Sequence, residues 1–344
     1  MKTQAAILVE QRKPLVIDEV EIPSLGYGQV LVEVKTSRIC GSQIGEIDGV
    51  KGPDRYLPHL LGHEGCGLVQ DVGPEVVHVK TGQKVVMHWR PGAGIQSKPP
   101  VYEWRGKKVS AGYVTTFNRY AVAAENRLTP IPDDFDEEVA PLLADTLTTG
   151  FGIITNNARA KIGESVLVIG CGGIGLGVIL GAKLAGTHPI LAADLSAAKL
   201  QKAAEYGATH LINVSKQDLA AAVGAIAGKQ GVDIVVDGTG NPRVIETAYA
   251  LTHPHGRCVL FGVMPHDKRV SIHTLPLHFG KILTGSEGGG SQPHVEIPRY
   301  VQMIRDGVFD PRGFISHRVK LEQINEAIDQ MRHGEVIHAI IHFS

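Results

Sequence analysis

Three short segments, far apart in the chain, contain side chains of the kinds that bind transition metals. They are Cys40-Gly41-Ser42, Gly62-His63-Glu64-Gly65, and the stretch around Asp145. A thiolate, an imidazole and a carboxylate suit tetrahedral Zn²⁺ and leave one coordination position for water or a substrate. The spacing alone does not establish such a site, because an isolated cysteine is usually a packed core residue. Whether the three segments meet depends on the fold that carries them.

A second candidate site is the glycine-rich segment Gly170-Cys171-Gly172-Gly173-Ile174-Gly175, which fits the pattern GxGxxG. The chain contains 41 glycines, so the pattern alone is weak, but here an apolar strand precedes it and an apolar helix follows. Glycines at such a turn let backbone N–H groups and the helix N-terminus approach a pyrophosphate. The segment therefore predicts a dinucleotide-binding turn, and the alternative is a strand–helix turn with a purely structural role.

An acidic residue follows this turn where a ribose-binding carboxylate is expected. Asp194 ends the next predicted strand, about 20 residues beyond the glycines. A carboxylate there accepts hydrogen bonds from the adenosine ribose and repels a 2′-phosphate, which predicts NAD rather than NADP. No arginine directly follows Asp194 to attract a 2′-phosphate. Lys199, one helical turn further on, either helps to hold the ribose or is a solvated helix lysine.

The overall composition indicates a globular protein without a polyanionic or lipid partner. The 344 residues correspond to about two domains, and 43% hydrophobic with 20% charged residues argues against wholesale disorder. A net charge of -1 offers no polybasic surface to nucleic acid, and no apolar run is long enough to predict a membrane span. The start, MKTQAAILVEQRKPL, is predicted to be a strand rather than a signal peptide. The cysteines are scattered without a CxxC pair, which predicts a reducing cytoplasmic environment rather than a disulfide framework.

Two patterns of secondary structure divide the chain. Roughly the first 145 residues hold β-branched runs between glycines and prolines. They predict short strands at 29–35, 67–72 and 84–87, and a long loop over 90–112. From Ser165 strands and helices alternate, and the continuous apolar strands indicate a parallel sheet covered on both faces. The predicted strands are 165–170, 189–193, 210–213, 232–236, 257–261 and 282–285, and the helices between them are 174–185, 196–206, 217–227 and 242–251. Helices over 297–306 and 321–333 and a strand over 336–343 follow.

Taken together, these segments resemble the medium-chain zinc-dependent alcohol dehydrogenases over nearly the whole chain. The resemblance is carried by GHEGCGLVQDVGPEV (62–76), the glycine-rich turn, and KLEQINEAIDQMRHGEVIHAIIHF (320–343). It implies an α/β fold: a doubly wound parallel (Rossmann) sheet with a discontinuous, β-rich, GroES-like catalytic domain in the form of a partly open barrel. The implied domains are 1–146 (catalytic, with the zinc site), 147–287 (NAD-binding) and 288–344 (return to the catalytic domain).

The same resemblance assigns roles to single residues. Cys40, His63 and Asp145 match zinc ligands, and Glu64 matches a carboxylate that either binds zinc or stands beside it. Ser42 matches the hydroxyl that bonds the substrate oxygen and begins a proton relay, and Trp89 matches an aromatic wall of the substrate pocket. Thr149 and Val263 match residues that line the nicotinamide, and Ile174 matches the branched residue packed behind the ring. The family also implies a homodimer or homotetramer formed through its central domains.

Four departures from the family pattern matter. No cysteine lies between 90 and 112, where many members bind a structural zinc, so one catalytic zinc and no structural zinc are expected. The relay histidine expected three residues after Ser42 is Gly45, and Glu46 or a chain of waters would have to replace it. His338 stands where an arginine often reaches the pyrophosphate, and it is mostly neutral at pH 7. The segment 49–59, near the substrate entrance, is slightly longer than is typical.

The small hydroxyl residue Ser42 leaves space for a secondary alcohol, and several polar residues favour a polyol or sugar-like alcohol as substrate. These residues are Lys51, Arg55, Trp89, Arg90, Trp104 and Arg105. Alternatively, their charges only solvate a long loop. Two other functions remain open: a zinc-free enone or quinone reductase, which would lack the Cys, GHE and Asp set, and a non-catalytic cofactor-binding protein, which the missing relay histidine favours.

Overall fold

The computed structural model describes residues 1–334 and 336–343. By its internal contacts the chain separates into two units, which are described in turn. Unit 1 comprises Met1–Asp145 and Gln292–Ser344, and unit 2 comprises Thr146–Ser291. That unit 1 is catalytic and unit 2 binds NAD stays a prediction.

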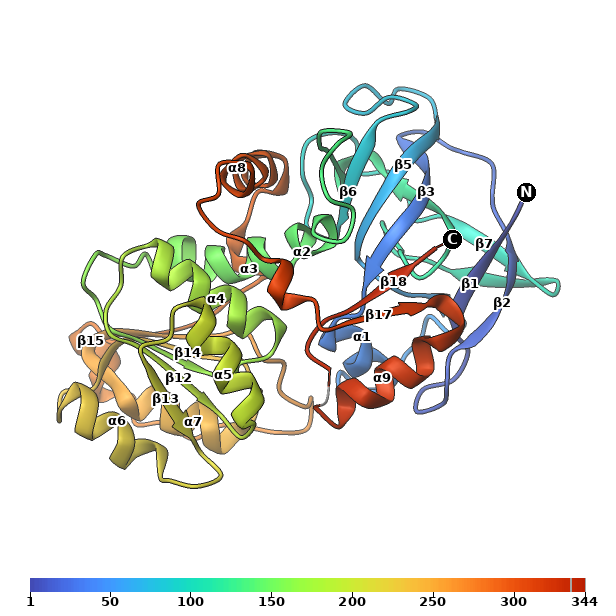
Figure 1. The fold of residues 1–344 in the computed structure, drawn as a ribbon. Coiled ribbons are helices and arrows are strands. Elements are labelled where there is room, and N and C mark those ends of the chain that lie inside the picture. Colours follow the sequence, from blue (N-terminus) through green and yellow to red (C-terminus); the bar gives the residue numbers. More distant parts are fainter. Residues whose placement is uncertain (335, 344) are drawn as a thin grey trace. The chain divides into compact units, whose positions relative to one another are not determined.

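Unit 1 is built from a small barrel and a larger sheet (Figure 1). The barrel closes in the order β1 (Lys2–Leu8), β2 (Val16–Glu21), β7 (Val101–Trp104), β8 (Lys107–Ser110) and β4 (His59–Leu60). The sheet has the order β10 (Leu128–Pro130), β6 (Lys84–His88), β5 (Glu64–Val72), β3 (Gln29–Arg38), β18 (Ala339–His342) and β17 (His317–Lys320), and β9 (Tyr120–Ala124) also pairs with β3. Its helices are α1 (Gly41–Ile47), α2 (Ala140–Ala144), α8 (Pro293–Arg305) and α9 (Ile324–Arg332).

Strand β3 is the centre of the larger sheet, since it pairs with β5, β9 and β18. Val30, Val32 and Val34 alternate along it and are fully buried in one hydrophobic cluster. This alternation is the period of a strand with one face in the core. The pairing with β18 brings the C-terminal segment, from the other end of the chain, beside the residues that lead to Cys40.

The predicted loop over 90–112 was wrong in its second half, where β7 and β8 form a hairpin. Tyr102, Trp104 and Val109 are buried while the residues between them face outward, as in a half-buried strand pair. The turn between the strands has positive φ at both Arg105 and Gly106, as type I′ hairpin turns require. An arginine rarely adopts that conformation, so the turn was not predicted from the sequence. The barrel that β7 and β8 help to form is closed rather than partly open.

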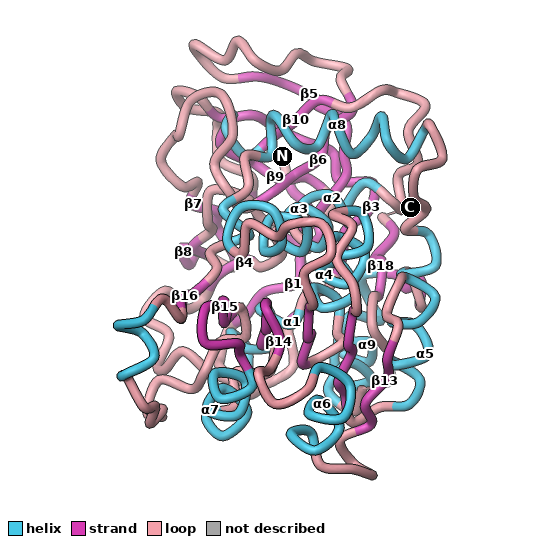
Figure 2. Tube along the Cα trace, turned by 90° about the vertical axis from the view of Figure 1, so that its left-hand side faces the viewer, coloured by secondary structure: helices cyan, strands magenta, loops and turns pink. Residues whose placement is uncertain are grey.

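Unit 2 is a six-stranded parallel sheet with helices on both faces, which confirms the predicted doubly wound class (Figure 2). The strand order is β13 (His210–Asn213), β12 (Ile190–Asp194), β11 (Val166–Ile169), β14 (Val232–Asp237), β15 (Thr252–Leu260) and β16 (Ile282–Gly285). The helices are α3 (Thr146–Gly152), α4 (Gly173–Leu184), α5 (Ala197–Tyr206), α6 (Leu219–Ala227) and α7 (Pro242–Leu251), with a π-helix at Ile153–Asn157. Successive strands run outward from β11 in both directions, so the order reverses between β11 and β14, where such sheets bind ligands.

Candidate active site

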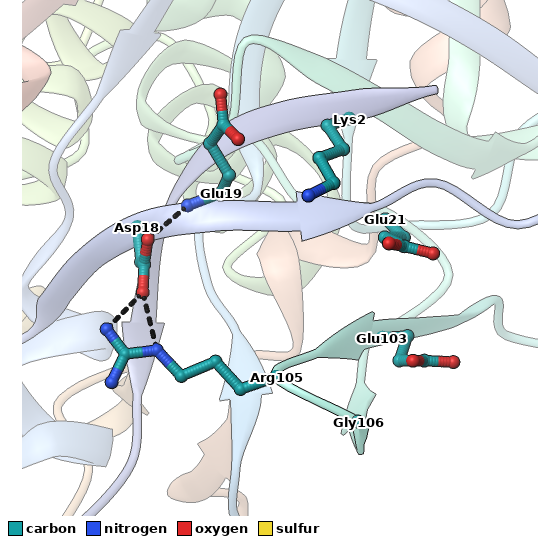
Figure 3. A pocket seen from close by; sticks show the side chains of 7 residues that line it. All are labelled: Lys2, Asp18, Glu19, Glu21, Glu103, Arg105 and Gly106. Carbon is teal, nitrogen blue, oxygen red and sulfur yellow. Dashed lines mark hydrogen bonds and ion pairs between the residues drawn. The ribbon is translucent and has the colours of Figure 1, made fainter.

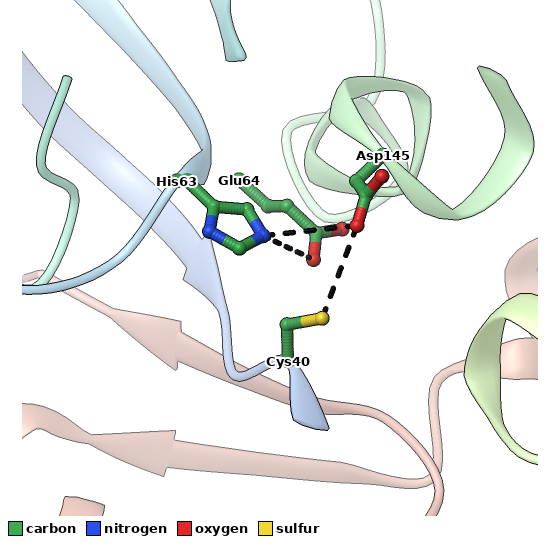
Figure 4. Close-up of side chains that lie close together, drawn as sticks. All are labelled: Cys40, His63, Glu64 and Asp145. Atoms are coloured by element: carbon green, nitrogen blue, oxygen red, sulfur yellow. Dashed lines mark hydrogen bonds and ion pairs between the residues drawn. The ribbon is translucent and has the colours of Figure 1, made fainter. Parts of the chain in front are cut away.

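Four side chains from three parts of unit 1 converge on one point (Figure 4). Cys40 follows β3 and immediately precedes α1, His63 and Glu64 lie at the start of β5, and Asp145 follows the last residue of α2. One donor atom from each of the four lies within 4.8 Å of all the others. The structure thus brings together the segments whose meeting the sequence alone could not establish.

The separations within this cluster fit donors arranged around a shared ion. Nε2 of His63 is 3.7 Å from an oxygen of Asp145 and 3.7 Å from an oxygen of Glu64. Sγ of Cys40 is 3.9 Å from the same Asp145 oxygen. Zinc with ordinary bond lengths would separate tetrahedral sulfur, nitrogen and oxygen ligands by roughly 3.3–3.6 Å. The observed distances are slightly longer than these, and the two nitrogen–oxygen distances are too long for N–H···O hydrogen bonds.

Two polar atoms at this site are buried without a hydrogen-bond partner in the described part of the chain. They are Nε2 of His63 and the hydroxyl oxygen of Ser42, two residues after Cys40. Unpartnered buried polar atoms are unusual in folded proteins and often mark a site for an ion, a water or a ligand. Their presence beside a thiol and two carboxylates fits a metal ion and a bound oxygen atom.

The electrostatics of the cluster favour a cation. Burial lowers the pKa of His63, but the nearby side chains of Asp145, Cys40 and Glu64 outweigh it and raise the pKa well above its usual value. The acidic groups therefore stabilise positive charge at the imidazole. A divalent ion would satisfy the same groups, and the donor set of sulfur, nitrogen and oxygen is one that zinc accepts.

Gln43 links two of the predicted ligands. It is 1% exposed, and its Oε1 accepts a hydrogen bond from the backbone N–H of Cys40 at 3.0 Å. Its amide nitrogen contacts Nδ1 of His63. Sequence reasoning missed this residue, although its position three residues after Cys40 places it within the first turn of α1. Gln43 therefore contacts both Cys40 and the ring of His63, and it positions one beside the other.

The carboxylate of Glu64 pairs with a buried arginine, which the sequence analysis also did not identify. Arg38 is 2% exposed and forms an ion pair with the fully buried Glu64. Burial raises the pKa of Glu64, and the charge of Arg38 opposes this effect. The Nε–H of Arg38 donates to Nδ1 of His338, and the ring of His338 stacks on Phe314 at a centroid distance of 5.6 Å.

This arrangement argues against the phosphate-binding role expected for His338. The histidine is fully buried, and burial together with the charge of Arg38 lowers its pKa well below the usual value. A neutral ring with no exposed surface cannot offer a charged contact to a pyrophosphate. His338 instead accepts a hydrogen bond from the arginine that faces Glu64.

Trp89 connects the cluster to a pocket of about 840 Å³ within unit 1. Its indole N–H donates to Asp145 at 3.1 Å, and its ring lines the pocket together with His63. The segment 49–59 contributes Lys51, Asp54, Arg55, Tyr56 and His59 to the lining, and Glu46 also lies there. Glu46, considered as a substitute for the missing relay histidine, is 3.9 Å from the ammonium group of Lys51.

Two of the predicted substrate-contacting residues lie elsewhere. Trp104 and Arg105 both donate hydrogen bonds to Asp18, and Arg105 and Asp18 belong to a second, smaller hollow at the barrel (Figure 3). That hollow is lined mainly by exposed acidic and basic side chains of β1, β2 and β7. The interpretation that some of these charges only solvate the surface fits Arg105, whose side chain is 70% exposed.

The predicted cofactor residues lie in unit 2, around the turn between β11 and α4. Gly170 has a φ of +94°, and a Cβ at Gly175 would lie 2.0 Å from the carbonyl oxygen of Gly170. A Cβ at Gly172 would meet nothing within 4 Å, so protein packing does not explain the missing side chain there. Helix α4 begins at Gly173 and presents its N-terminus at this turn, as a phosphate-binding turn requires.

Asp194 ends β12 and bonds to the glycine-rich turn itself. One carboxylate oxygen accepts from the backbone N–H of Cys171 at 2.8 Å, and the other accepts from that of Ser196 at 2.8 Å. Lys199 is half-buried in the first turn of α5. Thr149 is buried in α3, Ile174 is half-buried in α4, and Val263 is 55% exposed in the loop after β15.

Comparison with known proteins places this arrangement in a family. Residues 26–133 match the alcohol dehydrogenase GroES-like domain, and residues 173–305 match the zinc-binding dehydrogenase family. An alcohol dehydrogenase class-3 from Cereibacter sphaeroides is 30% identical, and the alignment covers 100% of both chains. The chain belongs to the medium-chain zinc-dependent alcohol dehydrogenase family.

Two other members of that alcohol dehydrogenase family match over the full chain. An S-(hydroxymethyl)glutathione dehydrogenase from Photobacterium damsela subsp. piscicida is 32% identical, with 100% of both chains covered. The crystal structure of an alcohol dehydrogenase zinc-binding domain protein from Burkholderia ambifaria superposes with a TM-score of 0.91 at 26% identity, covering 100% of this chain and 99% of that one. The predicted family resemblance is therefore confirmed, and the chain is an alcohol oxidoreductase. Among the described residues no helix has the length and apolar character needed to cross a membrane.

Proposed function

We propose that the chain transfers a hydride reversibly between an alcohol and NAD, using one zinc ion held by Cys40, His63 and Asp145. Glu64, whose carboxylate faces both this cluster and Arg38, either completes the ligand set or stands beside it. The observation that carries the proposal is the convergence of the four donor groups within 4.8 Å of one another. The unpartnered Nε2 of His63 supports it, since that atom is the one a metal ion would engage.

The residues around the cluster have separate tasks. A bound zinc ion would act as a Lewis acid that lowers the pKa of an alcohol oxygen. The hydroxyl of Ser42, buried without a partner in the described structure, receives the alcohol proton and passes it toward solvent. Gln43 holds Cys40 and His63 in position, and Trp89 forms one wall of the substrate pocket while its N–H orients Asp145.

The cofactor is assigned to the turn at Gly170–Gly175. The glycines leave the backbone N–H groups and the α4 N-terminus open to the pyrophosphate. Asp194, with Lys199 beside it, is assigned to the adenosine ribose, and its charge favours NAD over NADP. Ile174, Thr149 and Val263 are assigned to the nicotinamide. A fixed cofactor and a positioned alcohol turn the reaction into an intramolecular one.

Metal analysis of the purified protein, combined with turnover of an alcohol panel with NAD and NADP, tests the proposal. We expect about one zinc per chain and NAD-dependent oxidation of at least one class of alcohol. Zinc-free protein that reduces enones or quinones would support the reductase alternative. Cofactor binding without turnover of any alcohol or carbonyl would support the non-catalytic alternative, and two zinc ions per chain would contradict the single site.

A further inference from the structure

The pocket beside His63 and Trp89 contains a buried arginine that the function proposed above does not use. Arg127 ends a short 3₁₀ turn, Glu125–Arg127, directly before β10, and it is 4% exposed. It lines the same 840 Å³ pocket as His63 and Trp89. Nothing in the sequence marked it, because burial of a single arginine depends on packing by distant segments.

The guanidinium of Arg127 has only neutral partners. Nη1 donates to the amide oxygen of Asn126 at 3.0 Å, and Nη2 donates to that of Gln96 at 3.0 Å. The cation also lies over the ring of Tyr113, 4.9 Å from its centroid. Nε is buried without a partner, and across the described residues no carboxylate forms an ion pair with this arginine. Three of the five N–H donors of the group thus remain unused.

Nearby carboxylates are engaged elsewhere. Glu125, two residues away, accepts hydrogen bonds from the backbone N–H groups of residues 77, 78 and 95. In the pocket wall, Asp54 is paired with His59 at 2.7 Å, and Glu46 faces Lys51 at 3.9 Å. None of these carboxylates forms an ion pair with Arg127 in the described part of the chain.

Arg38 is a second buried arginine with which Arg127 can be compared. It is as deeply buried as Arg127, but it is paired with Glu64, and the nearby acidic groups raise its pKa despite the opposing effect of burial. Burial, with the charge of Arg90 nearby, lowers the pKa of Arg127. Burying a cation without a counter-charge is costly, so such a group usually marks a site where an anion binds.

We propose that the pocket binds an alcohol carrying an anionic oxygen group, a carboxylate or a phosphate, which Arg127 receives while the hydroxyl lies toward His63. A guanidinium with unused N–H donors matches both anions, because it can give two parallel hydrogen bonds to either. The inference rests on the proposed function, since it assigns a substrate class to the same pocket. Neutral polyols are then poorer substrates than alcohols of equal length with a terminal negative charge.

The test compares matched alcohols with the zinc-loaded protein and NAD. The set is an ω-hydroxycarboxylate, its methyl ester, and the phosphate monoester of the corresponding diol. For the unaltered protein we expect kcat/KM to be at least about tenfold higher for one of the charged alcohols than for the ester, mainly through KM. Comparison of kcat/KM for the carboxylate and the phosphate shows which anion the pocket prefers.

Variants of Arg127 test whether this residue causes the preference for charged alcohols. Arg127→Met should bring the ratio of charged to neutral kcat/KM close to one, and Arg127→Lys should retain part of it because the charge remains. Arg105→Met, which removes an arginine bonded to Asp18 away from this pocket, is the matched control and should leave the ratio unchanged. If Arg127→Met does not fold, Arg127→Lys and Arg127→Gln give the same comparison.

The outcomes separate the inference from the function on which it rests. Equal or better turnover of the ester by the unaltered protein would overturn the inference and leave the dehydrogenase function intact. A preference for the charged alcohol that survives Arg127→Met would overturn the role of Arg127. If zinc-loaded protein oxidises no alcohol, the proposed function fails, and calorimetric binding of the hydroxycarboxylate against its ester, with and without Arg127→Met, then decides the inference.

Discussion

Two aspartates, one in each unit, occupy opposite kinds of environment. Asp194 in unit 2 directs both carboxylate oxygens to backbone N–H groups, each at 2.8 Å. Asp145 in unit 1 accepts from the indole of Trp89, and its other oxygen lies 3.7 Å from His63 and 3.9 Å from Cys40. The first carboxylate is bonded within its own turn, whereas the second also faces a ring nitrogen and a sulfur that belong to the other candidate metal ligands.

The difference indicates what each residue can do without a ligand. Asp194 joins the end of β12 to the glycine-rich turn, so it shapes the turn in addition to the ribose contact proposed for it. Each of its oxygens still has a second lone pair with which to accept from a ribose hydroxyl. Asp145 accepts the indole N–H of Trp89 with one oxygen, and its other oxygen faces Cys40 and His63, with which the proposed function has it share a cation.

Removing the thiol of Cys40 tests the Asp145 side of this contrast and should have the largest effect. Cys40→Ala is expected to lose zinc and to lower kcat/KM by about three orders of magnitude or more, since the metal supplies several kcal/mol of charge stabilisation. Cys66→Ala is the matched control: Cys66 is buried in β5 outside the cluster, and burial raises the pKa of its thiol to about 12. Full zinc and activity in Cys40→Ala, measured by elemental analysis and NADH absorbance, would contradict the ligand assignment.

Asp194→Ala tests the other side of the contrast. Loss of the carboxylate should reduce the preference for NAD over NADP by about a hundredfold, because one negative charge near the 2′-phosphate is removed. The zinc content should not change. The measurement is the ratio of kcat/KM for the two cofactors, and Asp218→Ala, at the N-cap of α6, controls for the loss of an aspartate that accepts a backbone N–H. An unchanged ratio would leave Asp194 with only its role in the turn.

The sequence predicted these two environments unequally well. The glycine-rich turn, Asp194 and the alternating strands form a local pattern, and the predicted strands at 210–213 and 282–285 match β13 and β16 residue for residue. The cluster of candidate zinc ligands joins residues up to 105 positions apart, so its convergence was predicted only through the family resemblance. Gln43, Arg38 and Arg127 were not found, because their roles depend on which distant groups burial places beside them. The burial of His338 against Arg38 could not be predicted from the sequence for the same reason.

Substitution of Gln43 should change the zinc affinity of the Asp145 cluster by less than the loss of a ligand does. Its Oε1 accepts from the N–H of Cys40, so its NH₂ group faces Nδ1 of His63. A histidine that binds a metal through Nε2 carries its proton on Nδ1, and two donors would then face each other. Gln43→Glu places an acceptor there and should tighten zinc binding by about tenfold, whereas Gln43→Leu should weaken it by a similar factor.

Competition with a chelator measures this change in zinc affinity independently of activity. Gln83→Glu is the control, because the Oε1 of Gln83 likewise accepts a backbone N–H, from Lys80 at 2.8 Å, but outside the cluster. Weaker zinc binding in Gln43→Glu would mean that the extra buried charge matters more than the hydrogen bond to Nδ1.

A third carboxylate, Glu138, should show the smallest effect, because its partners are the surface side chains of Arg318 and His342 rather than a backbone amide or the candidate metal ligands. Arg318 of β17 donates two hydrogen bonds to it, each 2.7 Å long, and these bonds lower the pKa of Glu138 below its usual 4.5. The stabilisation is thus fully present above about pH 4.5 and is lost as the pH falls through the lower folded value. Glu138→Gln should reduce the free energy of unfolding at pH 7 by only about 0.5–1 kcal/mol, because solvent and salt screen the pair. Urea unfolding at pH 7 and near pH 3.5 measures this, and a difference from the unaltered protein that did not shrink at the lower pH would show that Glu138 stabilises the fold through something other than its charge.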